Sequence, residues 1–248
     1  MTKAILIQAR SASSRLPGKI YAGIPEENST PLLMHVVKRM RAAECGEVVV
    51  LIPSDDARLK AFLEANNVRF VSGSHQDVRD RYRKAAIELG LDLIVRATAD
   101  NPCLDPEFAR LTVERLERDR LDLFSFSGMP LGTGVEAFTR DALFRDGLDG
   151  PEYREHVSLH IKHEPDRFRV LHSPWSERVP DKAPRLTVDS SEDLEVVRGV
   201  FRELGDDFCL ADIIDLLSRK PEMFTGNSHV QQVTFKPPGA NSSSGSKP

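Results

Sequence analysis

The chain has 248 residues, of which 40% are hydrophobic and 29% charged, and its formal net charge is −4. This length and composition predict a globular protein with one large domain and a substantial core. The net negative charge argues against a general nucleic-acid binder, and no apolar run is long enough to span a membrane. Because no signal-peptide segment opens the chain and its three cysteines lie far apart, we expect a cytoplasmic protein with reduced thiols.

The first half of the chain alternates between predicted strands and helices. Apolar runs rich in β-branched residues predict strands at residues 4–9, 48–52, 68–71 and 91–98. Apolar residues at helical spacing predict helices at residues 32–40, 59–63 and 78–89. This rhythm predicts an α/β fold with a Rossmann-like, mostly parallel sheet flanked by helices. Ligands of such sheets bind beyond the carboxyl ends of the strands, so three loops should converge on one pocket: 9–19, 72–77 and 99–105.

The second half is less regular, and we assign to it a smaller lobe at about residues 128–185. The elements expected from here on are strands at 135–138, 167–172 and 185–188 and helices at 151–163, 191–204 and 210–219. One domain is expected over residues 1–220. From Pro221 onward the composition shifts to Ser, Gly, Asn, Pro and Lys, which predicts a largely disordered tail over residues 221–248.

The predicted first strand leads directly into a loop of small residues that carries three cations. Arg10, Arg15 and Lys19 lie in this loop, beside a Pro-Gly turn. A strand end followed by such a loop presents backbone N–H groups and positive charge to one point, which is how proteins hold polyphosphates. The loop matches neither the Walker A pattern nor the Gly-x-Gly-x-x-Gly turn. From the residues alone, a solvated surface loop is an equally good interpretation.

The same segment resembles a known nucleotide-binding loop. Its pattern reads Gln8-Ala9-Arg10-x-x-Ser13-x-Arg15-Leu16-Pro17-Gly18-Lys19. It is similar to the loop of cytidylyltransferases that activate sugar acids, such as the CMP-Kdo and CMP-acylneuraminate synthetases, and closest to the related spore coat polysaccharide biosynthesis proteins. The resemblance covers roughly residues 3–204. It implies the nucleotide-diphospho-sugar transferase fold, which is GT-A-like, and a loop that wraps the triphosphate of CTP.

The resemblance also implies roles for individual loop residues. Arg10 and Lys19 are implied to be catalytic, because with Arg15 they offset the charge of the triphosphate and of the leaving pyrophosphate. The nucleotide-binding residues of this loop are then Gln8, Ala9, Arg10, Ser13, Arg15 and Lys19.

Asp100 directly follows the strand predicted at 91–98. A carboxylate in this place lies at the functional edge of the sheet, or it starts a turn before Pro102. Relatives carry a Gly-Asp-x-Pro turn here whose aspartate binds the catalytic magnesium. The resemblance therefore implies that Asp100 binds metal and nucleotide, although Ala99 stands where the glycine is common. For Asp105 a helix cap is the better interpretation.

Asp189 follows the strand predicted at 185–188 and precedes two serines and two acidic residues. From the residues alone this is a helix N-terminus, with Ser190 or Ser191 as the N-cap. The segment also resembles the family's Asp-Thr-Pro-Glu-Asp-Leu, in which the first aspartate is the second magnesium ligand. The resemblance thus implies a Mg²⁺ site formed by Asp100 and Asp189, whose hard oxygen ligands suit this ion.

Two segments of the second half resemble the acceptor site of the family. Residues 134–138 are similar to a Gly-x-Glu strand, and residues 154–157 are similar to an Arg-Glu-His-Val segment. The resemblance implies that Glu136, Arg154 and His156 bind the acceptor.

Two further charged residues have open interpretations. Asp77 lies in a segment that resembles the nucleotide side of the family's site, but as a charged residue opening a helix it is equally a surface residue. Arg96 is unusual within a buried strand. It is expected to pair with Asp100 or Asp77, or to reach the ligand.

Three histidines are spaced along the helix predicted at 151–163, at His156, His160 and His163. No further ligand stands at a readable spacing, and the apolar residues between them explain the helix by burial. We therefore do not expect zinc there.

The implied function is a Mg-dependent nucleotidyltransferase that transfers CMP from CTP to an acidic sugar or related acceptor and releases pyrophosphate. One alternative is a nucleotide-binding homologue without turnover. Another is a glycosyltransferase that uses a nucleotide-sugar donor, against which the lack of an Asp-x-Asp motif at residues 98–100 counts. The expected partners are CTP and a small acceptor, with no nucleic acid or membrane. A homodimer is expected through the 128–185 lobe, where Trp175 and Phe168 look exposed.

Overall fold

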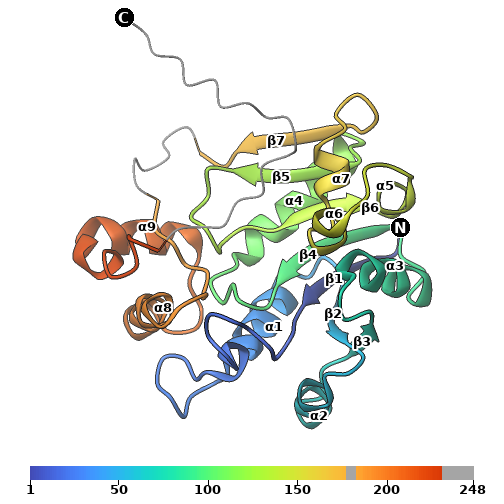
Figure 1. Cartoon of the computed structure of the whole chain (residues 1–248). Coiled ribbons are helices and arrows are strands. Elements are labelled where there is room, and N and C mark those ends of the chain that lie inside the picture. Colours follow the sequence, from blue (N-terminus) through green and yellow to red (C-terminus); the bar gives the residue numbers. More distant parts are fainter. Residues whose placement is uncertain (177–182, 231–248) are drawn as a thin grey trace, which may run out of the picture.

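A computed structural model describes residues 1–176 and 183–230 of the chain. These residues form one seven-stranded sheet of order β3-β2-β1-β4-β6-β5-β7 (Figure 1). The strands are β1 (Lys3–Gln8), β2 (Glu47–Pro53), β3 (Phe70–Gly73), β4 (Leu93–Thr98), β5 (Leu123–Ser127), β6 (Glu136–Thr139) and β7 (Val170–Pro174). β6 runs antiparallel to its neighbours β4 and β5, and the other neighbouring strands are parallel. The predicted α/β fold with a mostly parallel sheet is therefore confirmed.

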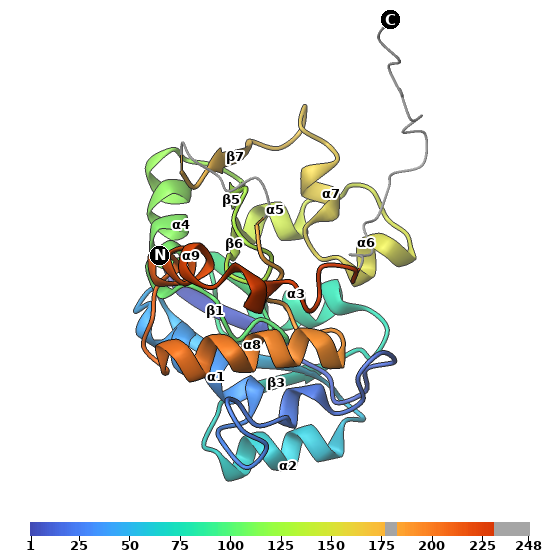
Figure 2. The same cartoon turned by 90° about the vertical axis from the view of Figure 1, so that its left-hand side faces the viewer.

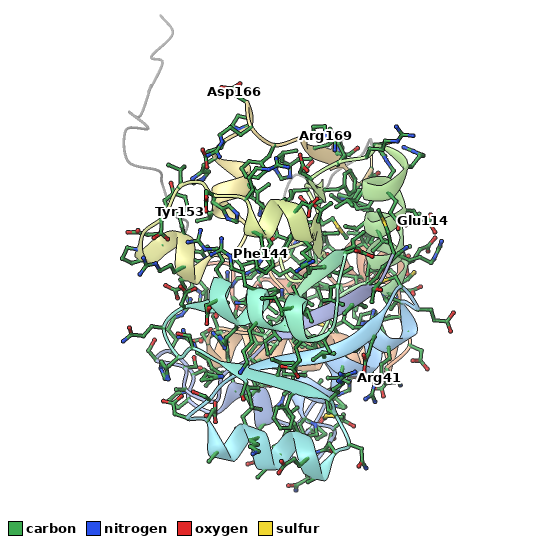
Figure 3. The ribbon with its side chains drawn as sticks, turned by 90° about the vertical axis from the view of Figure 1, so that its right-hand side faces the viewer. Arg41, Glu114, Phe144, Tyr153, Asp166 and Arg169 are labelled. Carbon is green, nitrogen blue, oxygen red and sulfur yellow. The ribbon has the colours of Figure 1, made fainter. Side chains whose placement is uncertain are left out.

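Helices cover both faces of this sheet. Successive residues of its buried strands point to opposite faces, and because these residues are apolar, both faces must be shielded from water. Ile5 and Ile7 belong to one core cluster, whereas Ala4 and Leu6 belong to the other. The first cluster is covered by α1 (Leu32–Ala42), α2 (Ala57–Ala65), α4 (Pro106–Arg118), α8 (Ser191–Leu204) and α9 (Leu210–Arg219) (Figure 2). The second is covered by α3 (Val78–Glu88), α5 (Arg140–Phe144) and α7 (Leu159–Lys162), with α6 (Pro151–Glu155) against α3. Figure 3 looks onto this second face, with Phe144 of α5 and Tyr153 of α6 labelled.

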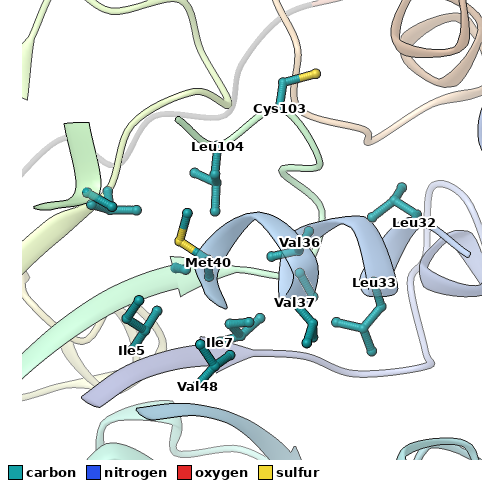
Figure 4. Packing of buried hydrophobic residues seen from close by; sticks show 14 of the residues in the cluster. Ile5, Ile7, Leu32, Leu33, Val36, Val37, Met40, Val48, Cys103 and Leu104 are labelled. Atoms are coloured by element: carbon teal, nitrogen blue, oxygen red, sulfur yellow. The ribbon is translucent and has the colours of Figure 1, made fainter. Parts of the chain in front are cut away.

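Packing beneath α1 fixes both ends of the loop that follows β1. Ile5, Ile7 and Val48 lie under α1, whose Leu33 and Met40 are fully buried (Figure 4). Burial of each such side chain contributes about 1.5–3 kcal/mol to folding. The loop from β1 to α1 is therefore anchored in the core on both sides, which holds its cations at the sheet edge.

After β4 the chain forms the helix α4, whose cap was expected, and the strand β5, which was not expected. Asp105 caps α4, since its carboxylate accepts a hydrogen bond from the N–H of Phe108 at 3.0 Å. This agrees with the helix-cap interpretation. β5 was not predicted, because its Leu-Phe-Ser-Phe-Ser sequence is short and half polar. It lies beside β6 in the sheet.

Two predicted elements between residues 151 and 188 are wrong. The single helix expected at 151–163 is two short helices, α6 and α7, because the backbone leaves helical geometry at His156 (φ −104°, ψ 86°). The three histidines therefore do not share one helix. Residues 185–188 do not form a strand either, and Arg185 makes only an isolated bridge with Leu131. The strand expected at 167–172 lies slightly later, as β7.

The packed chain also continues past the domain end that we expected at residue 220. A 3₁₀ helix, η2 (Pro221–Phe224), buries Phe224 in the first core cluster. Asn227 is 1% exposed, and its side-chain amide donates to the Arg185 carbonyl at 2.9 Å and to Asp193 Oδ1 at 2.8 Å. Residues 221–230 are thus part of the domain, whereas the disorder expected for the last dozen residues falls outside the described residues. No helix in the described ranges is long and apolar enough to cross a membrane.

Candidate active site

A cavity of about 630 Å³ opens at the carboxyl ends of β1 and β4. Its walls come from the loop after β1, the segment before α3, the turn after β4, the end of α6 and the segment before α8. The lining residues used below are Gln8, Ala9, Arg10, Ser13, Arg15, Lys19, Arg81, Arg96, Asp100, His156, Arg185 and Asp189. All three loops that were expected to converge contribute to this cavity.

Lys19 lies where the two separated aspartates meet. Its Nζ atom donates to Asp100 Oδ2 at 2.9 Å, to Asp189 Oδ1 at 2.9 Å and to the carbonyl oxygen of Val188 at 2.7 Å. Gly18 before it has a positive φ of 71°, which lets the chain turn into the 3₁₀ helix η1 (Lys19–Tyr21). The Val188 N–H donates to the Asp100 carbonyl at 2.9 Å, so the two acidic segments are tied together by the main chain as well.

Asp189 is surrounded by positive charge. Besides Lys19, Arg15 Nη2 lies 2.9 Å from its Oδ1, and Arg185 Nη2 lies 2.6 Å from its Oδ2. Burial alone would raise the pKa of Asp189, but the hydrogen bond from Lys19 and the charges of the three cations hold this pKa below its usual range.

The helix-cap interpretation applies to the neighbours of Asp189 rather than to its carboxylate. Ser190 is the N-cap of α8, and it forms a capping box with Asp193. Asp193 is fully buried, and its Oδ2 also accepts the N–H of Asp189 at 2.9 Å. The side chain of Asp189 is therefore left to face the cavity.

The donor set of Asp100 and Asp189 fits a magnesium ion. Two carboxylates from different segments point to one place, and Mg²⁺ in proteins takes one or two carboxylates together with waters and substrate phosphates. Within residues 1–176 and 183–230, no group of three or more His, Cys, Asp and Glu side chains could hold a metal by itself. A cation at Asp100 and Asp189 would thus need oxygens from a bound phosphate or from water.

Two other cations reach the cavity without a carboxylate partner among the described residues. Arg10 is exposed at the cavity wall. Arg81 is 3% exposed, and its Nε and Nη1 atoms have no hydrogen-bond partner in the described chain. Burial lowers the pKa of the Arg81 guanidinium, and the nearby charge of Arg10 lowers it as well. Such donors suit a ligand rich in hydrogen-bond acceptors.

Arg81 belongs to the segment that resembles the nucleotide side of the family's site, and from the sequence it was left open between that site and the surface. Arg81 follows Val78 by one turn of α3, so both line the same cavity wall. Gly73 leaves room for its side chain, since a Cβ atom at Gly73 would lie 2.9 Å from Arg81 Cγ.

Of the other residues expected in the site, His156 lines the cavity. Asp77, Arg154 and Glu136 do not line it. Asp77 caps α3 by accepting the N–H of Asp80 at 2.7 Å. Arg154 is exposed and donates through Nη2 to Asp149 Oδ2 at 2.6 Å. The third residue, Glu136, is buried behind the cavity wall.

Arg96 pairs with Glu136 and with neither of the aspartates considered above. The two residues are direct neighbours across β4 and β6, and Arg96 Nη1 lies 3.0 Å from Glu136 Oε1. Glu136 also accepts hydrogen bonds from Ser158 Oγ at 2.6 Å and from Lys162 Nζ. Burial alone would raise the pKa of Glu136, but Lys162 and Arg96 outweigh it and lower this pKa to about 2.

A parallel-sheet edge that gathers a cation-rich loop and two carboxylates is typical of enzymes that act on nucleoside triphosphates. A family model described as cytidylyltransferase matches residues 4–199. The chain belongs to this cytidylyltransferase family, and it is a nucleotidyltransferase that uses CTP.

Individual relatives agree with this assignment. The chain is 29% identical over 229 residues to the spore coat polysaccharide biosynthesis protein SpsF of Bacillus subtilis, covering 89% of this chain and 95% of that protein. It is 29% identical over 143 residues to a 3-deoxy-manno-octulosonate cytidylyltransferase of Idiomarina loihiensis, covering 56% and 54%. The solved structure of a cytidylyltransferase from Leptospira borgpetersenii has a TM-score of 0.82 at 28% identity, covering 95% of this chain and 100% of that one. The predicted resemblance to cytidylyltransferases is therefore confirmed.

Proposed function

We propose that this protein transfers CMP from CTP to an acidic sugar or a related acceptor, with Mg²⁺ as cofactor and pyrophosphate as the second product. The observation that carries the proposal is the meeting of Asp100 and Asp189 at Lys19 Nζ, inside a cavity lined by further cations. An acidic sugar is proposed because one relative is named a 3-deoxy-manno-octulosonate cytidylyltransferase.

In this reaction the acceptor hydroxyl attacks the α-phosphorus, and the bond to the bridging oxygen of the pyrophosphate breaks. The protein's main work is to position the reactants and offset charge, as in phosphoryl transfer generally. Arg10, Arg15 and Lys19 would neutralise the triphosphate and then the leaving pyrophosphate. Asp100 and Asp189 would hold Mg²⁺, which when bound supplies further charge neutralisation and lowers the pKa of the attacking hydroxyl.

Incubation of the protein with CTP, Mg²⁺ and a panel of acidic sugars tests the proposal. We expect pyrophosphate release that requires both CTP and one of the acceptors, and little release with the other nucleoside triphosphates. Release of a nucleoside diphosphate from a nucleotide-sugar donor would instead identify a glycosyltransferase. CTP binding without turnover on any acceptor would identify an inactive homologue.

Lys19→Ala is expected to weaken CTP binding by about 1.5–3 kcal/mol, because it removes a charge-assisted contact to phosphate. The loss should be larger at low salt than at high salt, because at high salt counterions already screen the attraction between Lys19 and the phosphates in the wild type. Titration calorimetry at two salt concentrations measures both effects. Lys60→Ala is the matched control, because it removes the same charge from an exposed position on α2. Unchanged affinity of Lys19→Ala at both salts would contradict this role.

We also propose a homodimer formed through the 128–185 lobe. The expectation that Phe168 is exposed was wrong, because it is 3% exposed within the second core cluster. Trp175 directly follows β7, which is an edge strand of the sheet. It is half-buried, and its Nε1 donates to the Gly128 carbonyl at 2.8 Å. Light scattering at tens of micromolar protein should give the mass of two chains, and a monomer there would contradict the proposal.

A further inference from the structure

Two main-chain hydrogen bonds tie the end of β1 into the sheet. The Ala9 N–H donates to the Leu51 carbonyl at 2.9 Å, and the Gln8 carbonyl accepts the N–H of Ala99 at 3.1 Å. The end of β1 is thereby fixed in the sheet, and it carries the side chain of Gln8 at the cavity. That side chain is half-buried and lines the cavity.

The orientation of the Gln8 amide is dictated by its neighbours. Its Oε1 atom accepts from Arg96 Nε at 3.1 Å and from the Tyr82 hydroxyl at 3.4 Å. A guanidinium has only donors, so the amide must turn its oxygen toward Arg96 and its NH₂ group away from it. No acceptor for this NH₂ group is found among the described residues. The end of β1 thus presents a neutral hydrogen-bond donor to the cavity.

Arg96 is in turn held by Glu136, both of whose carboxylate oxygens accept hydrogen bonds from protein donors. Glu136 receives Arg96, Ser158 and Lys162, and its side chain is only 7% exposed. An ionised, buried carboxylate with three donors is a rigid anchor. The contacts of Glu136 thus connect it to the cavity through Arg96 and Gln8.

We infer that Glu136 and Arg96 are positioning residues that fix the Gln8 amide so that its NH₂ group donates to an acceptor atom of the cytosine base. The inference deepens the proposed function and rests on the use of CTP. A neutral donor suits a neutral acceptor such as the carbonyl oxygen or the unprotonated ring nitrogen of cytosine. The charged phosphates are instead matched by the cations Arg10, Arg15 and Lys19.

Calorimetry with CTP and with inorganic tripolyphosphate tests this inference. Gln8→Met keeps the length of the side chain but removes the donor, and we expect about tenfold weaker CTP binding with unchanged tripolyphosphate binding. Gln8→Glu keeps the partner of Arg96 but turns an acceptor toward the base. We expect it to bind CTP more weakly than Gln8→Met does.

Two further variants separate positioning from general packing. Glu136→Gln should weaken CTP binding but not tripolyphosphate binding, because Arg96 loses its anchor. Tyr82→Phe removes a hydroxyl that lies 3.2 Å from the Leu6 carbonyl and only 3.4 Å from Gln8 Oε1, while Arg96 still holds the amide. It should change CTP binding by less than about threefold. Should Glu136→Gln fail to fold, the two Gln8 variants still decide the question.

Three results would overturn the inference while leaving the proposed function intact. They are wild-type affinity for CTP in both Gln8 variants, an equal loss of tripolyphosphate binding in those variants, and a loss in Tyr82→Phe as large as in Gln8→Met. A wild-type protein that does not bind CTP would overturn the proposed function, and this inference with it.

Discussion

Asp189→Asn should abolish most turnover, with a decrease on the order of a hundredfold or more, and should also lower the melting temperature. The carboxylate is one of two proposed metal ligands, and it pairs with Lys19, Arg15 and Arg185. Repulsion between Asp100 and Asp189 does not offset this loss, because Lys19 already lies between them. The amide leaves these cations poorly compensated, which costs about 1.5–3 kcal/mol.

Asp100→Asn should reduce turnover as strongly but lower the melting temperature less. Its side chain is 29% exposed and, in the described chain, pairs only with Lys19. Turnover is measured by pyrophosphate release and melting without ligand. The double variant should be little worse in turnover than either single one, since the two carboxylates act as a unit. Asp215→Asn, on the exposed side of α9, is the control. Near-normal turnover in Asp189→Asn would contradict the metal assignment.

The largest loss of stability is expected from Glu136→Gln, at about 3–5 kcal/mol. This variant removes the charge that compensates Arg96 and Lys162 inside the protein. The folded-state pKa of Glu136 is lowered from 4.5 to about 2, so its contribution is fully present above pH 4.5 and is lost as the pH falls toward 2. Wild type and variant should therefore differ most near neutral pH and converge in acid.

Urea unfolding of both proteins from about pH 7 down to about pH 3 measures this difference. Because all other carboxyl groups titrate in both proteins, the difference between them isolates Glu136. A difference in unfolding free energy that stays constant over this range would contradict a charge-based role.

The first half of the fold was predictable because its signals are local. β1, β2, β4 and the helices between them are long, apolar and periodic, and parallel topology brings their carboxyl ends to one edge. The position of the cation-rich loop followed from this rhythm alone. The proximity of Asp189 to Asp100 could not be predicted from the alternation of strands and helices. It depends on a single hydrogen bond from the Val188 N–H to the Asp100 carbonyl, made by a segment that is not a strand.

The partner of Arg96 could not be predicted from the sequence for a topological reason. β6 enters the sheet antiparallel, between β4 and the unpredicted β5, and this places Glu136 directly across from Arg96. A sequence pattern reports whether a residue is in a strand, but not which strand lies beside it. The acceptor-binding role that the resemblance implies for Glu136 stays a prediction, whereas its contacts with Arg96, Ser158 and Lys162 are given by the structure.

The hydrogen bonds of Asn227 limit how far this chain can be shortened. Its amide joins the Arg185 carbonyl and the Asp193 carboxylate, and these two residues flank Asp189. A truncation at residue 220, where the composition changes, would remove these two hydrogen bonds and the buried Phe224 side chain as well. A truncation after residue 230 would keep both. A cut chosen from composition alone would thus loosen the wall of the cavity without touching any residue that lines it.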